Sequence, residues 1–475
     1  MNRQQRLMKS EWLRLRRRGW GLFLCGVILL SGLFVLAGRE FFWARSMERY
    51  TSPETLAADA RREMERLQAE QPEGYEIDLE KLRFLLEEGV PLSEPNWRLE
   101  AAERLASERK QLLSLLKNGL DDEQELTLRL ASLGRDEKLI RAGDPVPYLQ
   151  KKRAEMQQNP DLSEEDLALA LWKLDYQLEY GIAEEENHWK YPVFSVLSGN
   201  IDRMRELERM ADAGFLDSGY QREYQRLERE FALDCYRLEQ GRERIANPGS
   251  ADYWDSEPFW SAVYLIQQEY RLPMLVLALL CGLLFGRDFS SGRMALLFGY
   301  PYRRGRIFSA RLSLWGLLAV GVGLLHFFGS ILAAGSFFGF GGLLSPALIW
   351  TEGGVRELPG MLPLLWEQLL DFPYYLLFGM LAWTLNWLLC NPWTAAGGTA
   401  VLVFLCKALE SRIAYAELVS WTRVLLFGNL DLSRVFQDTS MYFQNPPLLS
   451  IVLLLLHGGI LLLISWDACV RREWG

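Results

Sequence analysis

The sequence contains few cysteines, and none of them is spaced for chemistry. Of the six, Cys235 stands alone in a polar region, and no two occur at the separation of a redox pair or of a zinc site. The sequence therefore predicts neither a disulfide framework nor a metal centre. The other five lie in or beside apolar runs, where we expect them to pack as small apolar residues: Cys25, Cys281, Cys390, Cys406 and Cys469.

Motifs for catalysis and nucleotide binding are also absent. The chain has no Gly-x-x-x-x-Gly-Lys-Ser/Thr phosphate loop, no His-Glu-x-x-His zinc helix and no Gly-x-Ser-x-Gly nucleophile elbow. Its carboxylates are too many and too evenly spread to single out a catalytic pair. We therefore expect no catalytic residue, no metal and no cofactor in this chain itself.

Charge is distributed very unevenly along the chain. Residues 45–260 carry 30 basic and 47 acidic side chains, out of 52 and 61 in the whole sequence. The remainder is slightly basic and consists mostly of apolar runs, as expected of membrane segments with basic inner flanks. The sequence pI near 5.3 thus reports the acidic region alone, and it indicates no nucleic-acid partner.

The first apolar run, Trp20–Gly38, contains no charged residue. About 20 apolar residues in a helix cover a hydrocarbon core of about 30 Å, so this run is long enough to span a bilayer. A cleaved signal peptide is the alternative, because the run follows a basic stretch and ends in small residues. Its uninterrupted length favours an uncleaved anchor, and either interpretation sends the next region outside.

Further apolar stretches follow the acidic region, and together with the first they predict about six transmembrane helices. They cover residues 272–286 (with a short apolar lead-in at 259–266), 312–334, 372–390, 394–409 and 448–466. Between them lie two moderately apolar loops, residues 335–371 and 410–447, which could lie in the membrane interface or re-enter the membrane. Tryptophans near the ends of the runs are typical of an aromatic belt.

The acidic region has the pattern of amphipathic helices. Apolar residues recur at three- and four-residue spacing among charges, for example over Leu162–Leu178, and β-branched alternation is almost absent. Ser163 followed by Glu-Glu-Asp predicts a capped helix start with an acidic first turn. Glycines and prolines divide the region into segments. We predict a bundle of antiparallel helical hairpins, and an all-α chain.

Basic residues near the ends of the apolar runs predict the orientation. Fifteen of them lie in the N-terminal tail, in the loop after the second run and at the C-terminus, whereas residues 335–371 contain one and residues 410–447 contain three. Six spans with both termini in the cytoplasm fit this asymmetry. The acidic region, between the first and second spans, is then extracellular.

The loop after the second span carries the most specific pattern. An acidic residue is followed four positions later by glycine, then by a Leu-rich turn, a proline and basic residues that lead into the third span: Asp288, Gly292, Leu296, Leu297, Pro301, Arg304 and Arg311. This pattern resembles the cytoplasmic loop of ABC-transporter permeases of the type-two export family, also called type V exporters. Asp288 stands where that family usually has Glu. The basic amphipathic segment at residues 7–20 resembles the family's helix on the inner membrane surface.

The resemblance implies that this loop couples the chain to a separate ABC ATPase subunit, which would bind ATP and Mg²⁺. It implies coupling roles for Asp288, Gly292, Arg293, Leu297, Pro301 and Arg304, and a homodimer or a heterodimer with a second permease. Physically, a short helix over Ser290–Phe298 that is continuous with two spans would pass a displacement into the bilayer. The alternative is that the arginines only hold the topology and bind anionic lipid head groups.

Polar residues in or near the spans are the candidates for a substrate path, because burying them in lipid is costly. Asn386, Lys407 and Glu410 are the three that we single out. The alternatives are that Asn386 bonds a neighbouring helix and that Lys407 extends to the membrane surface. For His326 and His457, which stand alone in apolar runs, we expect packed, hydrogen-bonded imidazoles.

The sequence thus predicts a multi-pass protein of the cytoplasmic membrane, of bacterial type, that is the permease subunit of an ATP-driven exporter. The expected parts are a surface helix (residues 1–19), span one (20–38), an extracellular domain (39–268), span two (269–286), a coupling loop (287–311) and spans three to six (312–475). The alternative function is a membrane-tethered extracellular binding or sensory protein without transport. The substrate is not readable from the sequence.

Overall fold

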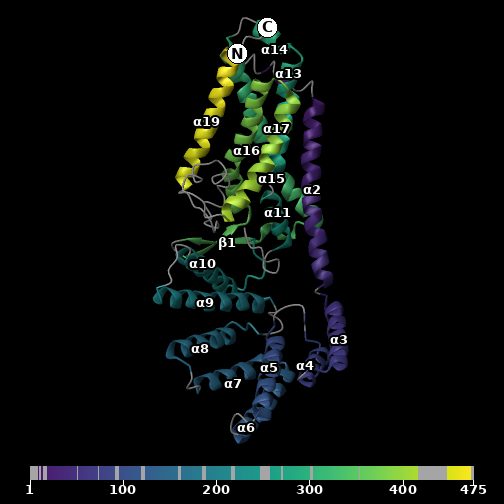
Figure 1. Ribbon diagram of the computed structural model, residues 1–475, viewed down its shortest axis with the longest axis vertical. Helices are drawn as coiled ribbons and strands as arrows, with labels where there is room; N and C mark the ends of the chain where they lie inside the picture. Colours follow the sequence, from purple (N-terminus) through teal and green to yellow (C-terminus); the bar gives the residue numbers. More distant parts are fainter. Residues whose placement is uncertain are drawn as a thin grey trace. The chain divides into compact units, whose positions relative to one another are not determined.

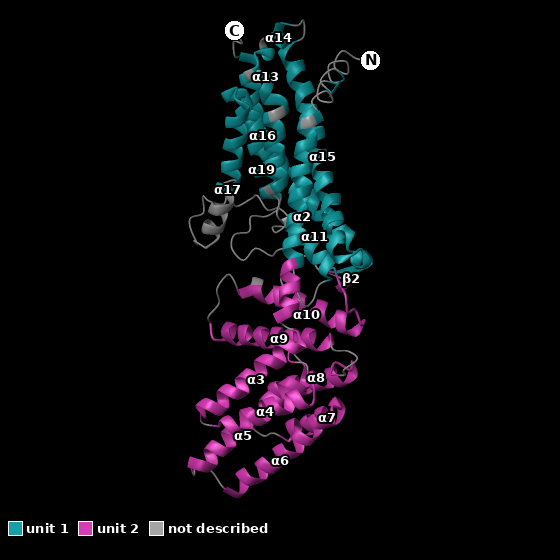
Figure 2. Ribbon diagram, turned by 90° about the vertical axis from the view of Figure 1, so that its right-hand side faces the viewer, with its two compact units in different colours: residues 1–41, 246–347, 358–475 teal, residues 42–245, 348–357 magenta. Residues whose placement is uncertain are grey.

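The structure, a computed structural model, describes residues 9, 12–13, 19–50, 52–72, 74–90, 92, 96–118, 123–158, 162–183, 189–214, 220–246, 257–268, 271–299, 303–351, 354–415 and 447–471. The chain forms two compact units (Figure 2). Unit 1 contains residues 1–41, 246–347 and 358–475, and unit 2 contains residues 42–245 and 348–357.

Unit 1 is a set of long apolar helices. In chain order it holds α2 (Gly19–Tyr50, which continues into unit 2), α11 (Pro258–Gln268), α12 (Arg271–Leu280), the π-helical segment η2 (Cys281–Gly286), α13 (Arg287–Ser290), α14 (Arg293–Gly299), α15 (Arg304–Phe338), η3 (Gly341–Leu344), α16 (Met361–Leu389), α17 (Pro392–Tyr415) and α19 (Pro447–Arg471). Figure 1 shows α15, α16 and α19 along one another, and each pair among them is packed together.

Four helices in the described part of the chain are long and apolar enough to cross a membrane: Gly21–Tyr50, Leu272–Phe289, Arg304–Phe338 and Leu448–Arg471. These helices indicate a membrane protein. They contain four of the predicted spans, and the predicted spans 372–390 and 394–409 lie in α16 and α17. Helix α16 is 29 residues long and carries several tryptophans, tyrosines and polar residues, and it is not among these four.

The first apolar run packs as an anchor would. Cys25, Leu29, Leu33 and Ala37 recur along one face of α2, and all four are buried in the core of unit 1. The helix does not end at Gly38, where the sequence predicted the end of the span, because no helix breaker follows. Of the predicted surface helix over residues 1–19, only residues 9, 12, 13 and 19 are described, and all four are helical.

The expected loop at residues 335–371 has a different structure. Helix α15 continues to Phe338, η3 follows, and then two strands pair as a hairpin, β1 (Pro346–Thr351) and β2 (Gly354–Pro359). Gly354 has φ +102°, which explains why a glycine stands at this turn. The hairpin is the exception to the predicted all-α chain. Its strands are short and lie between apolar helices, so their alternation did not stand out in the sequence.

Unit 2 is helical, as predicted. Its helices are α3 (Pro53–Glu70), α4 (Tyr75–Glu87), α5 (Trp97–Asn118), α6 (Glu123–Ala142), α7 (Pro145–Gln157), α8 (Glu164–Glu179), α9 (Lys190–Asp212) and α10 (Tyr220–Glu239). Figure 2 shows them in a stack, in which chain neighbours such as α5 and α6, α7 and α8, and α9 and α10 pack on each other. The predicted cap of α8 is confirmed, because the Asp166 amide donates to Ser163 Oγ at 3.1 Å.

An apolar core of its own stabilises unit 2. Trp97, Tyr148, Phe194 and Leu197 are all buried in it. Such a core is what a chain segment needs to fold as a compact domain. The boundary of the unit differs from the predicted residues 39–268, because residue 246 and residues 257–268, which hold α11, belong to unit 1.

A bidentate ion pair fixes the hairpin strand β2 within unit 2. Arg242, which follows α10, donates from Nε and Nη2 to the two carboxylate oxygens of Glu357 at 2.7 and 3.0 Å. Two parallel hydrogen bonds to a carboxylate specify geometry as well as adding energy. This contact explains why residues 348–357 belong to unit 2 although they lie far from it in sequence.

Candidate functional site

The predicted coupling loop contains short helices, two of which are separated by a sharp turn. The chain runs helically through α12, η2 and α13, turns at Gly292 with φ +67°, and forms the short helix α14 before α15 begins. The left-handed turn requires glycine in practice, since other residues are strained there. The short helix is Arg293–Gly299 rather than the predicted Ser290–Phe298, because the Gly292 turn separates it from α13.

A buried ion pair joins the two sides of this loop. Arg311 Nη2, on α15, donates to Asp288 Oδ2, on α13, at 2.7 Å. The two side chains are 1% and 2% exposed. Arg311 Nη1 also lies 3.1 Å from the sulfur of Met294, on α14. One guanidinium therefore contacts all three helices of the loop. Because Asp288 is buried, it holds the loop together and does not present its carboxylate at the surface.

Arg304 ties the start of α15 to the C-terminal helix. Its Nη1 donates to the carbonyl oxygen of Val470, on α19, at 2.7 Å. Its guanidinium also lies over the ring of Phe298, 5.2 Å from the centroid, in a cation–π arrangement. A cation near the C-terminal carbonyls of a helix is favourable because those carbonyls carry partial negative charge.

One face of α14 is open. Leu296 is 71% exposed and Arg293 is exposed, whereas Met294 is buried and Leu297 is half-buried against the core of unit 1. The exposed apolar side chain of α14 is therefore Leu296, and the predicted coupling residue Leu297 lies beside it, half-buried. Helical spacing from Arg293 would have indicated Leu296. The predicted coupling residue Pro301 lies outside the described residues.

Aromatic side chains pack beside the loop, on η2, α13, α15, α16 and α19. Phe285 and Phe289 meet Trp383 and Trp387 edge-on, each pair with ring centroids 4.9 Å apart. Phe308, on α15, meets Trp466, on α19, edge-on at 5.2 Å. Edge-to-face pairs of this kind are favourable and directional. These rings connect the loop to α16 and connect α15 to α19.

Glycines permit the closest of these approaches. A Cβ built on Gly305 would lie 2.6 Å from the indole ring of Trp466, so no larger residue fits there without moving the tryptophan. A Cβ on Gly286 would lie 2.4 Å from Oδ1 of Asn386. Asn386 is 1% exposed, and neither atom of its carboxamide has a hydrogen-bond partner among the described residues. It packs against the π-helical segment, and within the part of the chain that the structure describes the predicted bond to a neighbouring helix is not formed.

For the other two predicted substrate-path residues, the structure describes the backbone alone. The backbone of Lys407 and Glu410 lies in α17, and their side chains lie outside the described residues. His457 agrees with the expectation of a hydrogen-bonded imidazole, because its Nδ1 lies 2.7 Å from the carbonyl oxygen of Leu453. No cluster of three or more potential metal ligands occurs in the described ranges.

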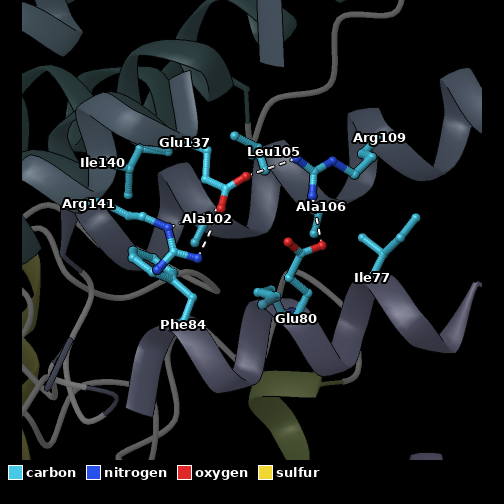
Figure 3. A pocket seen from close by; sticks show the side chains of 11 residues that line it. Ile77, Glu80, Phe84, Ala102, Leu105, Ala106, Arg109, Glu137, Ile140 and Arg141 are labelled. Atoms are coloured by element: carbon cyan, nitrogen blue, oxygen red, sulfur yellow. Dashed lines mark hydrogen bonds and ion pairs between the residues drawn. The ribbon is translucent and has the colours of Figure 1, made fainter. Parts of the chain in front are cut away.

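Unit 2 contains a groove between α4, α5 and α6 (Figure 3). Its floor is apolar and includes Ile77, Phe84 and Ile140, and its open volume is about 30 Å³. That volume holds about one small group. Charged side chains cross its rim: Arg109 donates to Glu80 at 2.9 Å and to Glu137 at 3.0 Å.

The charged side chains at the rim of the groove are paired with one another. Arg141 donates to Glu137 at 2.9 and 3.0 Å and lies over the ring of Phe84, 4.8 Å from the centroid. Burial alone would raise the pKa of Glu137, but the hydrogen bonds and positive charges of Arg141 and Arg109 outweigh it and hold the pKa below its ordinary value. The groove is thus bridged by satisfied ion pairs that join three helices.

Comparisons with known proteins found one relative. The chain is 25% identical over 300 residues, 62% of its own length and 87% of the relative's, to the uncharacterized protein YhcI of Bacillus subtilis (strain 168). No protein-family model matches the chain. No solved structure matches it.

Proposed function

We propose that this protein is the membrane-spanning permease subunit of an ATP-driven ABC exporter, in which a separate ATPase subunit supplies the energy. The observation that carries the proposal is the short helix α14, which stands between two apolar helices with an open face at Arg293 and Leu296. An exposed leucine beside an arginine on a rigid helix is suited to a groove on a partner protein. The resemblance of residues 287–311 to exporter coupling loops supports the same assignment.

The mechanism follows from the contacts of the loop. Closure of the ATPase would push on α14, and the Asp288–Arg311 pair would pass the movement to α13 and α15 together, because one guanidinium contacts both and α14 as well. Arg304 and the aromatic contacts would carry it to α19 and α16. Rigid elements with buried, directional contacts are what such a transmission requires. A path between two permease protomers would then open alternately on each side.

Affinity purification in mild detergent tests the proposal. The intact protein should bring down an ATPase subunit, and the complex should hydrolyse ATP. Leu296→Asp should reduce the recovered ATPase about tenfold, as expected when a charge replaces a central apolar contact. The matched control is Leu128→Asp on α6, where the leucine is 70% exposed. Equal recovery of the ATPase with both variants, or none with the unaltered protein, would count against the proposal.

A second candidate function rests on unit 2. Its separate core and its charge-bridged groove suit a membrane-tethered binding or sensory domain that transports nothing. If unit 2 is the functional part, substitutions at the groove should abolish the binding or sensing activity. Leu296→Asp and Arg304→Ala should then leave that activity unchanged. The exporter function predicts the reverse, because the loop would receive the movement of the ATPase subunit.

A further inference from the structure

A second groove, in unit 1, lies between α2, α12 and α17. Its open volume is about 320 Å³, within the range of about 300–1,000 Å³ that small-molecule sites occupy. None of the described residues that line it is charged. The groove therefore suits an apolar occupant of considerable size.

The residue pattern of the two helices explains the open space. Leu272, Val276 and Leu279 lie at four- and three-residue spacing on one face of α12, and Ala396 and Gly397 line the groove from α17. Val276 and Ala396 are 1% and 5% exposed and form the floor. A Cβ built on Gly397 would meet nothing within 4 Å. The small residues of α17 thus leave room for a chain that this protein does not itself supply.

The groove is formed by apolar helices that suit a membrane. Helix α2 forms one of the four helices long and apolar enough to cross it, α12 begins another, and Pro392–Leu405 of α17 is a shorter apolar helix. Water is absent from the hydrocarbon core of a bilayer, and apolar cavities stay dry. An alkyl chain is therefore the occupant that the groove fits. Because lipid tails are as apolar as leucine, any selectivity must come from the head group.

One end of the groove has the residues that bind a head group. Trp393 is 68% exposed at the start of α17, and tryptophan is typical of the head-group level of a membrane. A Cβ on Gly286 would lie 2.8 Å from Cα of Pro392, so the next residue, the exposed Arg287, stands at the same end. The π-helical segment η2 also ends here, and π-turns are rare and frequent at functional sites.

We propose that this groove binds one acyl chain of an anionic phospholipid, with the phosphate beside Arg287 and the head group level with Trp393. An uncharged groove that ends at a cation is complementary to an uncharged chain that ends in an anion, and a guanidinium donates well to phosphate oxygens. The inference goes beyond the exporter proposal, because it requires a membrane but no ATPase subunit.

Photo-crosslinking of the full chain tests this site. The protein is placed in phosphatidylcholine nanodiscs with a small fraction of phosphatidylglycerol that carries a diazirine in the middle of one acyl chain. Mass spectrometry after illumination and digestion should find the adducts concentrated in residues 272–279 and 393–400. The same diazirine chain on phosphatidylcholine should give about fivefold fewer adducts there, as expected for one arginine near an anionic head group.

Two pairs of variants separate the groove from the head-group end. Gly397→Leu fills the groove and should abolish the concentration of adducts, whereas Gly321→Leu on α15 should leave it unchanged. Both glycines are exposed, and a Cβ on either would meet nothing within 4 Å, so the two changes add the same bulk in open space. Arg287→Gln leaves the groove intact and should remove only the preference for phosphatidylglycerol. Arg306→Gln, at an exposed position of α15, should retain that preference.

Three results would overturn the proposal. Adducts spread evenly over α2, α15 and α19 would mean that lipids only surround the protein. Equal yields from the two lipids in the unaltered protein would mean that the groove does not select an anionic head group. If a second copy of the chain fills the groove, Gly397→Cys in a cysteine-free background should form an intermolecular disulfide, and residues 272–279 and 393–400 should carry no lipid adducts.

Discussion

Arg311 and Asp288 form an ion pair that water does not reach. Arg311 Nη2 lies 2.7 Å from Asp288 Oδ2, and the two side chains are 1% and 2% exposed. Opposite charges in a low-dielectric interior attract strongly, but removing both from water is costly, so such a pair specifies an arrangement more than it adds stability. Here the arrangement is the angle of the loop between the second and third predicted spans.

Replacing one partner of this pair should destabilise the protein far more than replacing both. Arg311→Met leaves the carboxylate of Asp288 buried without its arginine, which should cost about 3–5 kcal/mol of the free energy of unfolding. The double variant Asp288→Asn with Arg311→Met should recover most of that loss, because no buried charge remains. Unfolding in mixed micelles measures both. Arg306→Met, at an exposed position of α15, is the control and should change little. A double variant as unstable as the single one would contradict this account.

Two glycines of α15 should respond to alanine in opposite directions. Alanine generally favours a helix over glycine by about 1 kcal/mol, and Gly316→Ala should be neutral or stabilising, since its Cβ would meet nothing within 4 Å. Gly305→Ala places a Cβ 2.6 Å from Trp466 and should destabilise by about 1–3 kcal/mol through overpacking. Thermal unfolding compares the two. Equal effects would mean that Gly305 and Trp466 are not in contact.

Acid should loosen the α5–α6 part of unit 2. The pKa of Glu137 is lowered in the folded protein, so its contribution to stability is present above its ordinary pKa and is lost as the pH falls through the lowered value. Glu137→Gln should remove this pH dependence. Hydrogen exchange of the full chain, corrected for the intrinsic effect of pH, measures it at α5 and α6. The control is Glu123→Gln at the exposed start of α6. Identical acid sensitivity of the two variants would refute the role of Glu137.

The sequence predicted the large features because they depend on local pattern. Apolar length predicted the helices that could cross a membrane, and the three- to four-residue spacing predicted the helical unit 2 and the Ser163 cap. The hairpin of β1 and β2 was not predicted, since six-residue strands beside long apolar helices give a weak alternating signal.

The sequence predicted which segment forms the candidate site, but it did not predict the contacts that the side chains of this segment make. Asp288 and Arg311 were both noted as parts of one loop pattern, yet their pairing depends on how α13 and α15 meet, which no local pattern contains. Their opposite signs at the ends of two apolar helices were the available signal. The exposure of Leu296 beside the half-buried Leu297 was not predictable for a related reason: the turn at Gly292 sets which side of α14 is open.

The central claim is that the open face of α14 lies in the cytoplasm while unit 2 lies outside. In a cysteine-free background, single cysteines at Leu296 and Leu128, which are 71% and 70% exposed, can be labelled with a maleimide that does not cross membranes. The account predicts labelling at position 128 in intact cells and at position 296 only in inside-out vesicles. Labelling of both positions in the same preparation would contradict it.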